Sequence, residues 1–202
     1  MTRNSLQRWW RRIFNGSHVQ LAPRRGRVRL RLETFEDRVL PSVFVVTTTN
    51  ETGAGSLYSA IMSSNSSPGP NGIDFEIGTG GPQTIALLQP LPTIVNNQVT
   101  IDGTSQPGWA GAPLIELLAL GNPSLPALTI TTSGCRIESL NIQSLTNPSP
   151  AVSLYSNDNV VSGDIINGFN TGVEIYDASG NVIGGTTPET GNTFERDRKS
   201  VV

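Results

Sequence analysis

Most of this chain carries few side chains that could act as acids, bases, nucleophiles or metal ligands. Between residues 41 and 195 the only basic residue is Arg136, which stands against 12 acidic residues. The one histidine, His18, precedes this region, and the one cysteine is Cys135. A His/Cys zinc site therefore has no ligand set here, and a Ser–His pair has no base. We expect Cys135 to be a buried, reduced thiol without a disulfide partner.

Carboxylates are the remaining candidates for binding or catalysis, because oxygen ligands hold Ca²⁺. Asp158, Asp164 and Asp177 fall within the repetitive stretch of residues 151–194. Outward carboxylates stacked one repeat apart could hold Ca²⁺. The same residues in solvated turns would have only a local structural role. The sequence leaves both alternatives open.

An internal repeat with a period in the low twenties determines where these side chains stand. Residues 152–155 are echoed by residues 173–176 at an offset of 21, and residues 159–163 by residues 181–185 at an offset of 22. The extra residue must lie in the turn between the two matches. Upstream, Leu128 precedes Val152 at an offset of 24. Such a period is typical of solenoids, in which each turn packs only on its neighbours.

Residue types within the repeat favour a parallel β-helix over other solenoids. Apolar residues alternate at i and i+2, as in Leu128 and Ile130, which indicates half-buried strands and excludes helical repeats. Leucine-rich repeats are disfavoured because most inward positions carry valine or isoleucine. We therefore predict an all-β, right-handed parallel β-helix in which equivalent strands pair one turn apart. The positions that define the repeat are Val152, Leu154, Val160, Val161, Val173, Ile175, Val182, Ile183, Gly184 and Gly185. Val182 and Ile183 are both expected to face inward.

The stretch ahead of the repeat is predicted to close one end of the coil. Ser56 could cap a short helix whose Leu57, Ala60 and Ile61 form one apolar face. Such a helix would cover the first turn, which otherwise exposes unpaired backbone groups. The predicted β-helix spans residues 42–196 and is incomplete at its C-terminus, with its N-terminal cap at residues 43–78 and its turns at residues 84–196. Early strands are expected at residues 43–47, 73–77, 84–88, 99–102 and 114–118.

Three short segments carry recognisable motifs. Residues 181–192 read N-V-I-G-G-T-T-P-E-T-G-N, and residues 101–108 read I-D-G-T-S-Q-P-G. Residues 53–61, G-A-G-S-L-Y-S-A-I, are followed by Ile73-Asp74-Phe75. The first resembles the NxIGGT…GN repeat of bacterial right-handed parallel β-helix proteins of the pectate-lyase-like superfamily. The last is similar to the GSLRxAI…DxIxF entry segment of these proteins, with Tyr58 in place of the usual arginine, and the segment IDGTSQPG is one they often carry.

The resemblance implies two kinds of enzyme to consider, a polysaccharide lyase and a polygalacturonase-like hydrolase. A polysaccharide lyase of the pectate-lyase type needs Ca²⁺-binding carboxylates and a basic residue that removes the proton α to a uronate carboxyl. Here only Arg136 could be that base, with Asp158, Asp164 and Asp177 as the Ca²⁺ candidates. A polygalacturonase-like hydrolase is disfavoured, because its histidine and its Arg-Ile-Lys motif are missing between residues 41 and 195.

We place a second function ahead of the lyase: a non-catalytic structural or adhesive protein, secreted or at the cell surface. An acidic rod with Asn, Ser and Thr faces would offer hydrogen bonds to its expected partners, polysaccharides or neighbouring envelope proteins. No cofactor is expected for this function.

The two ends of the chain differ from its middle. Ten of the 14 basic residues lie before Leu40, and residues 1–41 are predicted to be a disordered basic leader with a targeting role. Binding of nucleic acid or of an anionic membrane is the alternative for the leader, and no nucleic acid is expected on the β-helix. Residues 32–41 resemble the LExLEDRxLP motif of bacterial envelope proteins, which implies an extracellular or cell-surface location. No standard signal peptide or transmembrane segment is evident. Residues 197–202 match one frame of a sequencing adapter, so we interpret them as an artefact and expect further turns after Arg196.

Overall fold

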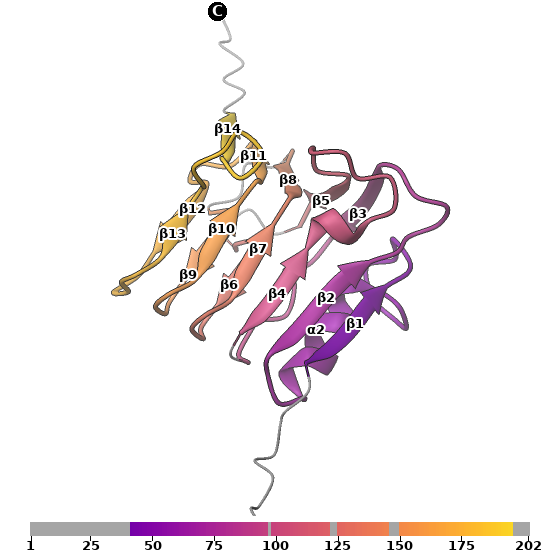
Figure 1. Ribbon diagram of the computed structural model, residues 1–202, viewed down its shortest axis with the longest axis horizontal. Coiled ribbons are helices and arrows are strands. Elements are labelled where there is room, and N and C mark those ends of the chain that lie inside the picture. Colours follow the sequence, from indigo (N-terminus) through magenta and orange to yellow (C-terminus); the bar gives the residue numbers. More distant parts are fainter. Residues whose placement is uncertain (1–40, 97, 122–124, 146–149, 196–202) are drawn as a thin grey trace, which may run out of the picture. The chain divides into compact units, whose positions relative to one another are not determined.

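The chain folds as a parallel β-solenoid of about five turns (Figure 1). The computed structural model describes residues 41–96, 98–121, 125–145 and 150–195, so the expected leader up to residue 40 and residues 197–202 lie outside the described part. Within it the elements are β1 (Ser42–Val46), α2 (Leu57–Asn65), β2 (Asn71–Phe75), β3 (Gln83–Leu87), β4 (Val99–Asp102), the 3₁₀ helix η1 (Gly103–Ser105), β5 (Ile115–Ala119), β6 (Leu128–Ile130), β7 (Arg136–Glu138), β8 (Leu140–Ser144), β9 (Val152–Leu154), β10 (Val160–Ser162), β11 (Ile165–Asn167), β12 (Val173–Ile175), β13 (Val182–Ile183) and β14 (Thr193–Glu195). The predicted all-β parallel architecture is confirmed.

Three parallel sheets form the walls of the coil. We call them sheet A (β1-β2-β4-β7-β10-β13), sheet B (β3-β5-β8-β11-β14) and sheet C (β6-β9-β12). Each strand pairs with its equivalent one turn away, so identical positions stack into columns. The central inward column of sheet A contains Ile73, Ile101, Ile137, Val161 and Ile183, of which the first four are fully buried. β-Branched side chains suit these positions because they are already restricted at χ1 and pack well on a pleated surface.

The register of the last turns confirms the repeat found in the sequence. Val173 pairs with Val152 and Ile175 pairs with Leu154, which is the first of the two sequence matches. Ile183 pairs with Val161, which is the second match and is longer by one residue. The gained residue lies in the turn between β12 and β13.

One expectation about side-chain direction is wrong. Ile183 continues an inward column, but Val182 pairs with Val160, which in turn pairs with Arg136 on the outward face. Val160 is half-buried and Val182 is 51% exposed. Successive residues of a strand point to opposite faces, so two adjacent apolar residues cannot both face inward.

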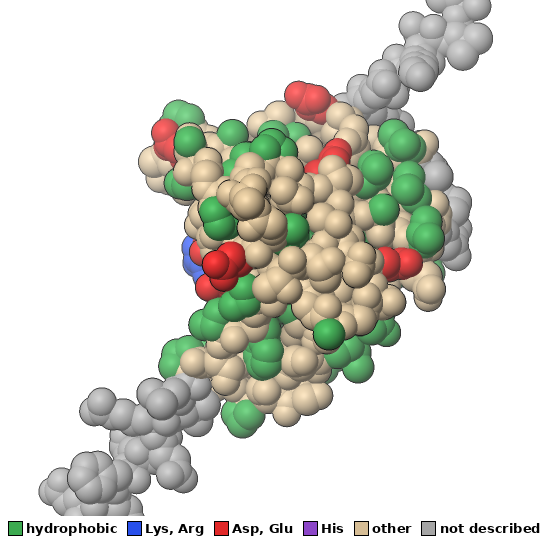
Figure 2. Space-filling model, turned by 90° about the vertical axis from the view of Figure 1, so that its right-hand side faces the viewer, with side chains coloured by type: hydrophobic (Ala, Val, Ile, Leu, Met, Phe, Trp, Pro, Cys, Tyr) green, Lys and Arg blue, Asp and Glu red, His purple; other side chains and the backbone are tan. Residues whose placement is uncertain are grey.

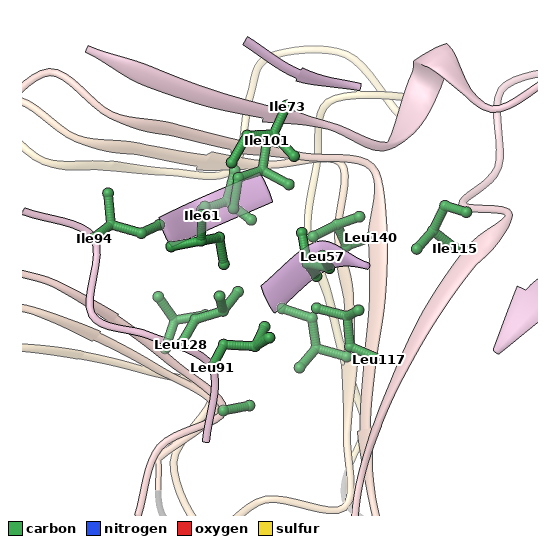
Figure 3. Close-up of a cluster of buried hydrophobic side chains, with 14 of the residues drawn as sticks. Leu57, Ile61, Ile73, Leu91, Ile94, Ile101, Ile115, Leu117, Leu128 and Leu140 are labelled. Carbon is green, nitrogen blue, oxygen red and sulfur yellow. The ribbon is translucent and has the colours of Figure 1, made fainter. Parts of the chain in front are cut away.

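Helix α2 closes the N-terminal end of the coil, as the sequence predicted. Ser56 is its N-cap, and the Ser56 hydroxyl accepts a hydrogen bond from the Ser59 backbone N–H at 3.2 Å. Leu57, Ala60 and Ile61 are buried on one side of the helix. Figure 3 shows Leu57 and Ile61 among the isoleucines and leucines of the first turns. The helix therefore supplies the apolar cover that a further turn would otherwise provide.

Two corners of the coil are joined by columns of asparagine or aspartate. At the start of sheet A, the Asn159 Oδ1 atom accepts from the Cys135 N–H at 2.8 Å, and the Asn181 Oδ1 atom accepts from the Asn159 N–H at 2.9 Å. We call Asn159 and Asn181 the first Asx column. These bonds satisfy backbone donors at corners, where no strand partner reaches them.

A second Asx column stands at the start of sheet B and consists of Asp164 and Asn192. The Asp164 Oδ1 atom accepts from the Leu140 N–H at 2.8 Å, and the Asn192 Oδ1 atom accepts from the Asp164 N–H at 2.9 Å. The Asn192 side-chain amide also donates to the Val161 carbonyl at 2.7 Å. Both columns thus connect the last three turns to one another at a fixed position.

The inward column of sheet A predicts that aspartate substitutions at the two neighbouring valines of β10 differ greatly in their effect on stability. Val161→Asp places an unpaired carboxylate in the core and should lower the free energy of unfolding by about 3 to 5 kcal/mol. Val160→Asp faces outward beside Arg136 and should change it by less than about 1 kcal/mol. Equilibrium urea unfolding measures both, and equal losses would show that the inward and outward assignments of β10 are wrong.

The first Asx column predicts a second difference in stability, between alanine substitutions at Asn159 and at Asn157. Asn159 is fully buried, and Asn159→Ala removes the acceptor of the Cys135 N–H and the side-chain donor to the Ser156 carbonyl. We expect a loss of about 2 to 4 kcal/mol, because these groups stay buried without partners. Asn157→Ala is the control. Asn157 is exposed, water can replace its bond to the Ser179 N–H, and the loss should stay below about 1 kcal/mol.

Candidate functional site

The outward face of sheet A gathers charged side chains on neighbouring turns. Asp74 pairs with Asp102, and Asp102 pairs with Glu138, so the three carboxylates form one outward column, which we call the acidic column. Neighbouring strands of a sheet are about 4.8 Å apart, which sets the spacing of the carboxylates. Arg136 lies two residues before Glu138 on the same face of β7. The face therefore combines the single cation of residues 41–195 with three stacked acids.

Each charged group of this face already has a partner or a near neighbour. The Arg136 guanidinium forms an ion pair with Glu138, and its Nε donates to Glu138 Oε1 at 2.7 Å. Asp102 Oδ1 accepts from the Thr104 N–H at 2.8 Å and from the Thr104 hydroxyl at 2.6 Å, capping η1. Partial burial and then the charge of Asp102 raise the pKa of Asp74. These contacts reduce the repulsion between the three carboxylates, so the column of like charges is tolerated.

Arg136 is placed to donate hydrogen bonds. Its side chain is 48% exposed, so it can reach a ligand in solvent while it keeps its bond to Glu138. A guanidinium has five N–H donors and no acceptor, and a carboxylate at its edge fixes the direction of the remaining donors. As it stands, the geometry suits recognition of an anionic or hydroxyl-rich ligand.

Asp158, Asp164 and Asp177 are not brought together as a calcium site. Asp158 and Asp177 are exposed in turns with positive φ values of 59° and 47°, whereas Asp164 is fully buried. Across the described ranges, no group of three His, Cys, Asp or Glu residues could hold a metal ion. The turn role that the sequence left open fits Asp158 and Asp177, because aspartate tolerates the left-handed conformation better than most residues.

Asp158 occupies a corner position that recurs on the turns from β4 onward. Thr100, Arg136, Val160 and Val182 are register partners in sheet A, and the residue two places before each of them has a positive φ. These residues are Gln98, Gly134, Asp158 and Gly180. The Asp158 N–H donates to the Ser179 carbonyl at 3.0 Å, and a Cβ atom at Gly180 would lie 2.1 Å from Asp158 Oδ1. Glycine at 180 therefore leaves the space that the Asp158 side chain fills.

Asp164 is a buried acid with one unpaired oxygen. Its Oδ1 atom accepts from Leu140, while Oδ2 is buried without a hydrogen-bond partner. Burial raises the pKa of Asp164 well above its usual value; the bond from Leu140 opposes the shift, and the charge of Glu138 adds to it. Asp164 thus takes the position that Asn192 takes on the next turn, but it lacks the amide group of Asn192.

The sequence motifs lie at corners and join neighbouring turns. In the segment of residues 101–108, the Gln106 side chain accepts from the Ile77 N–H at 3.0 Å and donates to the Ile77 carbonyl at 3.0 Å. The Ser105 hydroxyl accepts from the Phe75 N–H at 2.7 Å. The segment of residues 181–192 begins and ends with members of the two Asx columns. In both motifs these polar side chains accept or donate bonds that join neighbouring turns.

A stacked pair of tyrosines forms a second exposed feature, which sequence analysis missed. Tyr155 and Tyr176 follow β9 and β12, and their rings lie 4.5 Å apart between centroids and within 4° of parallel. Both side chains are exposed. A hydrogen bond with Glu174 is the main cause that raises the pKa of Tyr176 to about 12. The signal was present, because both tyrosines end the first pair of matching segments in the sequence.

The acidic column was missed for a related reason. Asp74, Asp102 and Glu138 each follow an isoleucine, and those isoleucines are successive members of the central inward column of sheet A. The repeated pair of isoleucine and acid could have been found, but its spacing differs from one turn to the next and exceeds the period of the later turns. Long corner insertions in the early turns cause this irregularity.

Cys135 is free and fully buried, as expected. Burial raises the pKa of its thiol, and its Sγ atom lies 3.6 Å from the Asn96 carbonyl oxygen.

Comparisons with protein-family models, curated proteins and solved structures gave no match. In the described residues, no helix has the length and apolar character needed to cross a membrane.

The environment of Asp164 predicts how stability depends on pH. Because the folded-state pKa is raised, the unfolded chain loses this proton first as pH rises, and stability falls from the unfolded value near 3.8 up through the folded value. Asp164→Asn should remove this fall and raise the free energy of unfolding at neutral pH by about 1 to 3 kcal/mol, since its amide can pair where Oδ2 cannot. Urea unfolding across this pH range is the measurement. Asp158→Asn, a change in an exposed turn that leaves Asp164 in place, is the control and should still show the fall caused by Asp164.

Proposed function

We propose that this chain is part of a non-catalytic structural or adhesive protein, secreted or held at the cell surface, and that it is related to right-handed parallel β-helix proteins of the pectate-lyase-like superfamily. The observation that carries the proposal is that the polar side chains of this chain form structural hydrogen bonds and an ion pair. Asp102 caps η1, Glu138 holds Arg136, and the motif residues bond neighbouring turns to each other. Side chains used in this way build a stiff, regular surface.

The surface itself fits hydroxyl-rich ligands. Figure 2 shows acidic side chains spread over a surface that is mostly uncharged. The exposed tyrosine pair offers flat apolar rings, with Glu174 bonded at its edge, and Arg136 adds donors on sheet A. Flat aromatic faces beside polar groups suit the apolar and hydroxyl faces of sugar rings. Polysaccharides of the envelope are thus the first partners to test, and other envelope proteins the second.

A polysaccharide lyase is the second candidate, favoured by one observation. Arg136 lies beside Glu138 and near Asp102 on one exposed face, so a cation and carboxylates are neighbours. In that function Arg136 would take the proton α to a uronate carboxyl and Ca²⁺ would bind the uronate. The ion pair with Glu138 counts against it, because a base must first give up that pair.

A binding experiment with matched variants tests the proposal. Purified protein is incubated with insoluble envelope polysaccharide and sedimented. We expect the wild type to co-sediment, and the double variant Tyr155→Ala with Tyr176→Ala to lose at least about 1 kcal/mol of binding, or fivefold in affinity. Tyr58→Ala, an exposed tyrosine on α2, is the control and should bind as the wild type does. Failure of the wild type to bind any envelope fraction would contradict the adhesive function.

The lyase assay uses the same preparations. Protein, polygalacturonate and Ca²⁺ are incubated, and the unsaturated uronate product is followed by its ultraviolet absorbance. We expect no product above the protein-free blank. Steady formation of product that Arg136→Gln abolishes would replace the structural function by the lyase.

A further inference from the structure

The two stacked tyrosines face each other because of the register of sheet C. The Tyr155 N–H donates to the Ile130 carbonyl at 2.8 Å, and the Tyr176 N–H donates to the Leu154 carbonyl at 2.9 Å, so parallel pairing continues one residue beyond the strands. Equivalent residues of neighbouring strands lie about 4.8 Å apart. The ring centroids are 4.5 Å apart, which matches this spacing. The backbones of two turns therefore hold the two phenols together.

The pair is open to solvent along its outer edges. Tyr155 has a described turn on both sides and is still 48% exposed, so the outward direction of the side chain exposes it. Thr131 takes the equivalent position on the turn before, because its neighbour Ile130 pairs with Leu154. The rings can thus tilt against each other without displacing core side chains.

Two stacked phenols are suited to oxidative coupling. Removal of one electron and one proton from a tyrosine leaves a phenoxyl radical, whose unpaired electron is shared between the oxygen and the ring carbons ortho to it. Two such radicals combine by forming one bond between ortho carbons, and the two ortho hydrogens then move through solvent to the phenol oxygens. The product is dityrosine, and the pair has lost two hydrogen atoms in total.

The surroundings of Tyr176 assist the loss of its proton. Its hydroxyl forms hydrogen bonds with the Glu174 carboxylate and with the Tyr155 hydroxyl. The bond with Glu174 is the main cause that raises the pKa of Tyr176, so the phenol stays protonated at neutral pH and must lose its proton when it loses an electron. A carboxylate within hydrogen-bond reach can accept that proton.

We propose that Tyr155 and Tyr176 form an oxidative cross-linking site, at which an external one-electron oxidant converts the stacked phenols into a dityrosine bond between neighbouring turns. A haem peroxidase with hydrogen peroxide is an oxidant of this class, since each peroxide accepts two electrons and two protons and becomes two water molecules. The site does not depend on the proposed binding of polysaccharide. Its product connects two turns covalently, and such a bond restricts their separation as a disulfide does.

The third tyrosine of the chain separates the effect of stacking from that of exposure. Tyr58 lies on α2 at the N-terminal end of the coil and is 36% exposed, which is close to the 37% of Tyr176. An oxidant that selects tyrosines by exposure alone would therefore attack both. Coupling within one chain requires a second phenol at contact distance, which the register supplies to Tyr176.

The test is oxidation of the full chain by hydrogen peroxide and a haem peroxidase, followed by mass spectrometry. We expect monomeric chains that have lost two hydrogen atoms and show dityrosine fluorescence. Cleavage after glutamate separates residues 139–174 from residues 175–189, so a covalent pair of these peptides identifies the bond. Dilution of the protein by about tenfold should leave the cross-linked fraction unchanged, because both phenols are held on one chain.

Matched variants and hydrogen exchange complete the experiment. Tyr155→Phe and Tyr176→Phe each keep the stacked ring and remove one phenol, so each should lower the yield of intrachain dityrosine at least about tenfold. Tyr58→Phe is the control and should leave this yield unchanged. In the cross-linked chain, the Tyr176 amide that donates to Leu154 should exchange at least about tenfold more slowly than before oxidation.

Four results would overturn the proposal. The oxidised monomer could keep all its hydrogen atoms. Dityrosine could form only between chains, so that the cross-linked fraction falls on dilution. Tyr58→Phe could lower the yield as much as Tyr155→Phe does, which would make exposure the cause in place of stacking. The Tyr176 amide could exchange equally fast after cross-linking, which would show that the bond does not hold the two turns together.

Discussion

Parallel pairing between equivalent strands one turn apart is the interaction on which the rest of this structure depends. It places residues such as Ile101 and Ile137 directly above one another and so turns a sequence repeat into a continuous core. No turn can bury its apolar side chains alone, because each one needs a neighbour on both sides. Helix α2 meets that need at the N-terminal end. In the last described turn, Ile175, Ile183 and Phe194 have a neighbouring turn on one side and are partly exposed.

At the corners of the coil the chain leaves one sheet, and its backbone N–H groups there have no strand partner. The molecule uses three devices there. Residues such as Gly134 and Asp158 adopt positive φ, the two Asx columns capture corner N–H groups, and Gln106 joins the first turn to the second with its side-chain amide. Each device fixes the position of one turn on the next, so the outward columns keep their register as well.

Register also connects fold to function. Because outward residues stack as strictly as inward ones, Asp74, Asp102 and Glu138 become one acidic column although they are far apart in sequence. The same rule stacks Tyr155 on Tyr176. A solenoid thus creates extended rows of like groups, which suit polymeric ligands better than small ones. This property supports the proposed binding of polysaccharide along the coil.

The sequence by itself determined the architecture and the late repeats. The two matching pairs of segments located the pairing of β9 with β12 and of β10 with β13, and Ser56 with its apolar partners located the cap helix. Periodicity could do this because strand alternation and helix spacing are local. Three matters were decided only by tertiary structure. Val182 faces outward because the register with Val160 sets its side, Asp164 is buried at a corner that the next turn fills with Asn192, and the acidic column forms across insertions of unequal length. In each case the deciding contact joins residues of different turns, and loops whose lengths vary from turn to turn hide those contacts from any fixed spacing in the sequence.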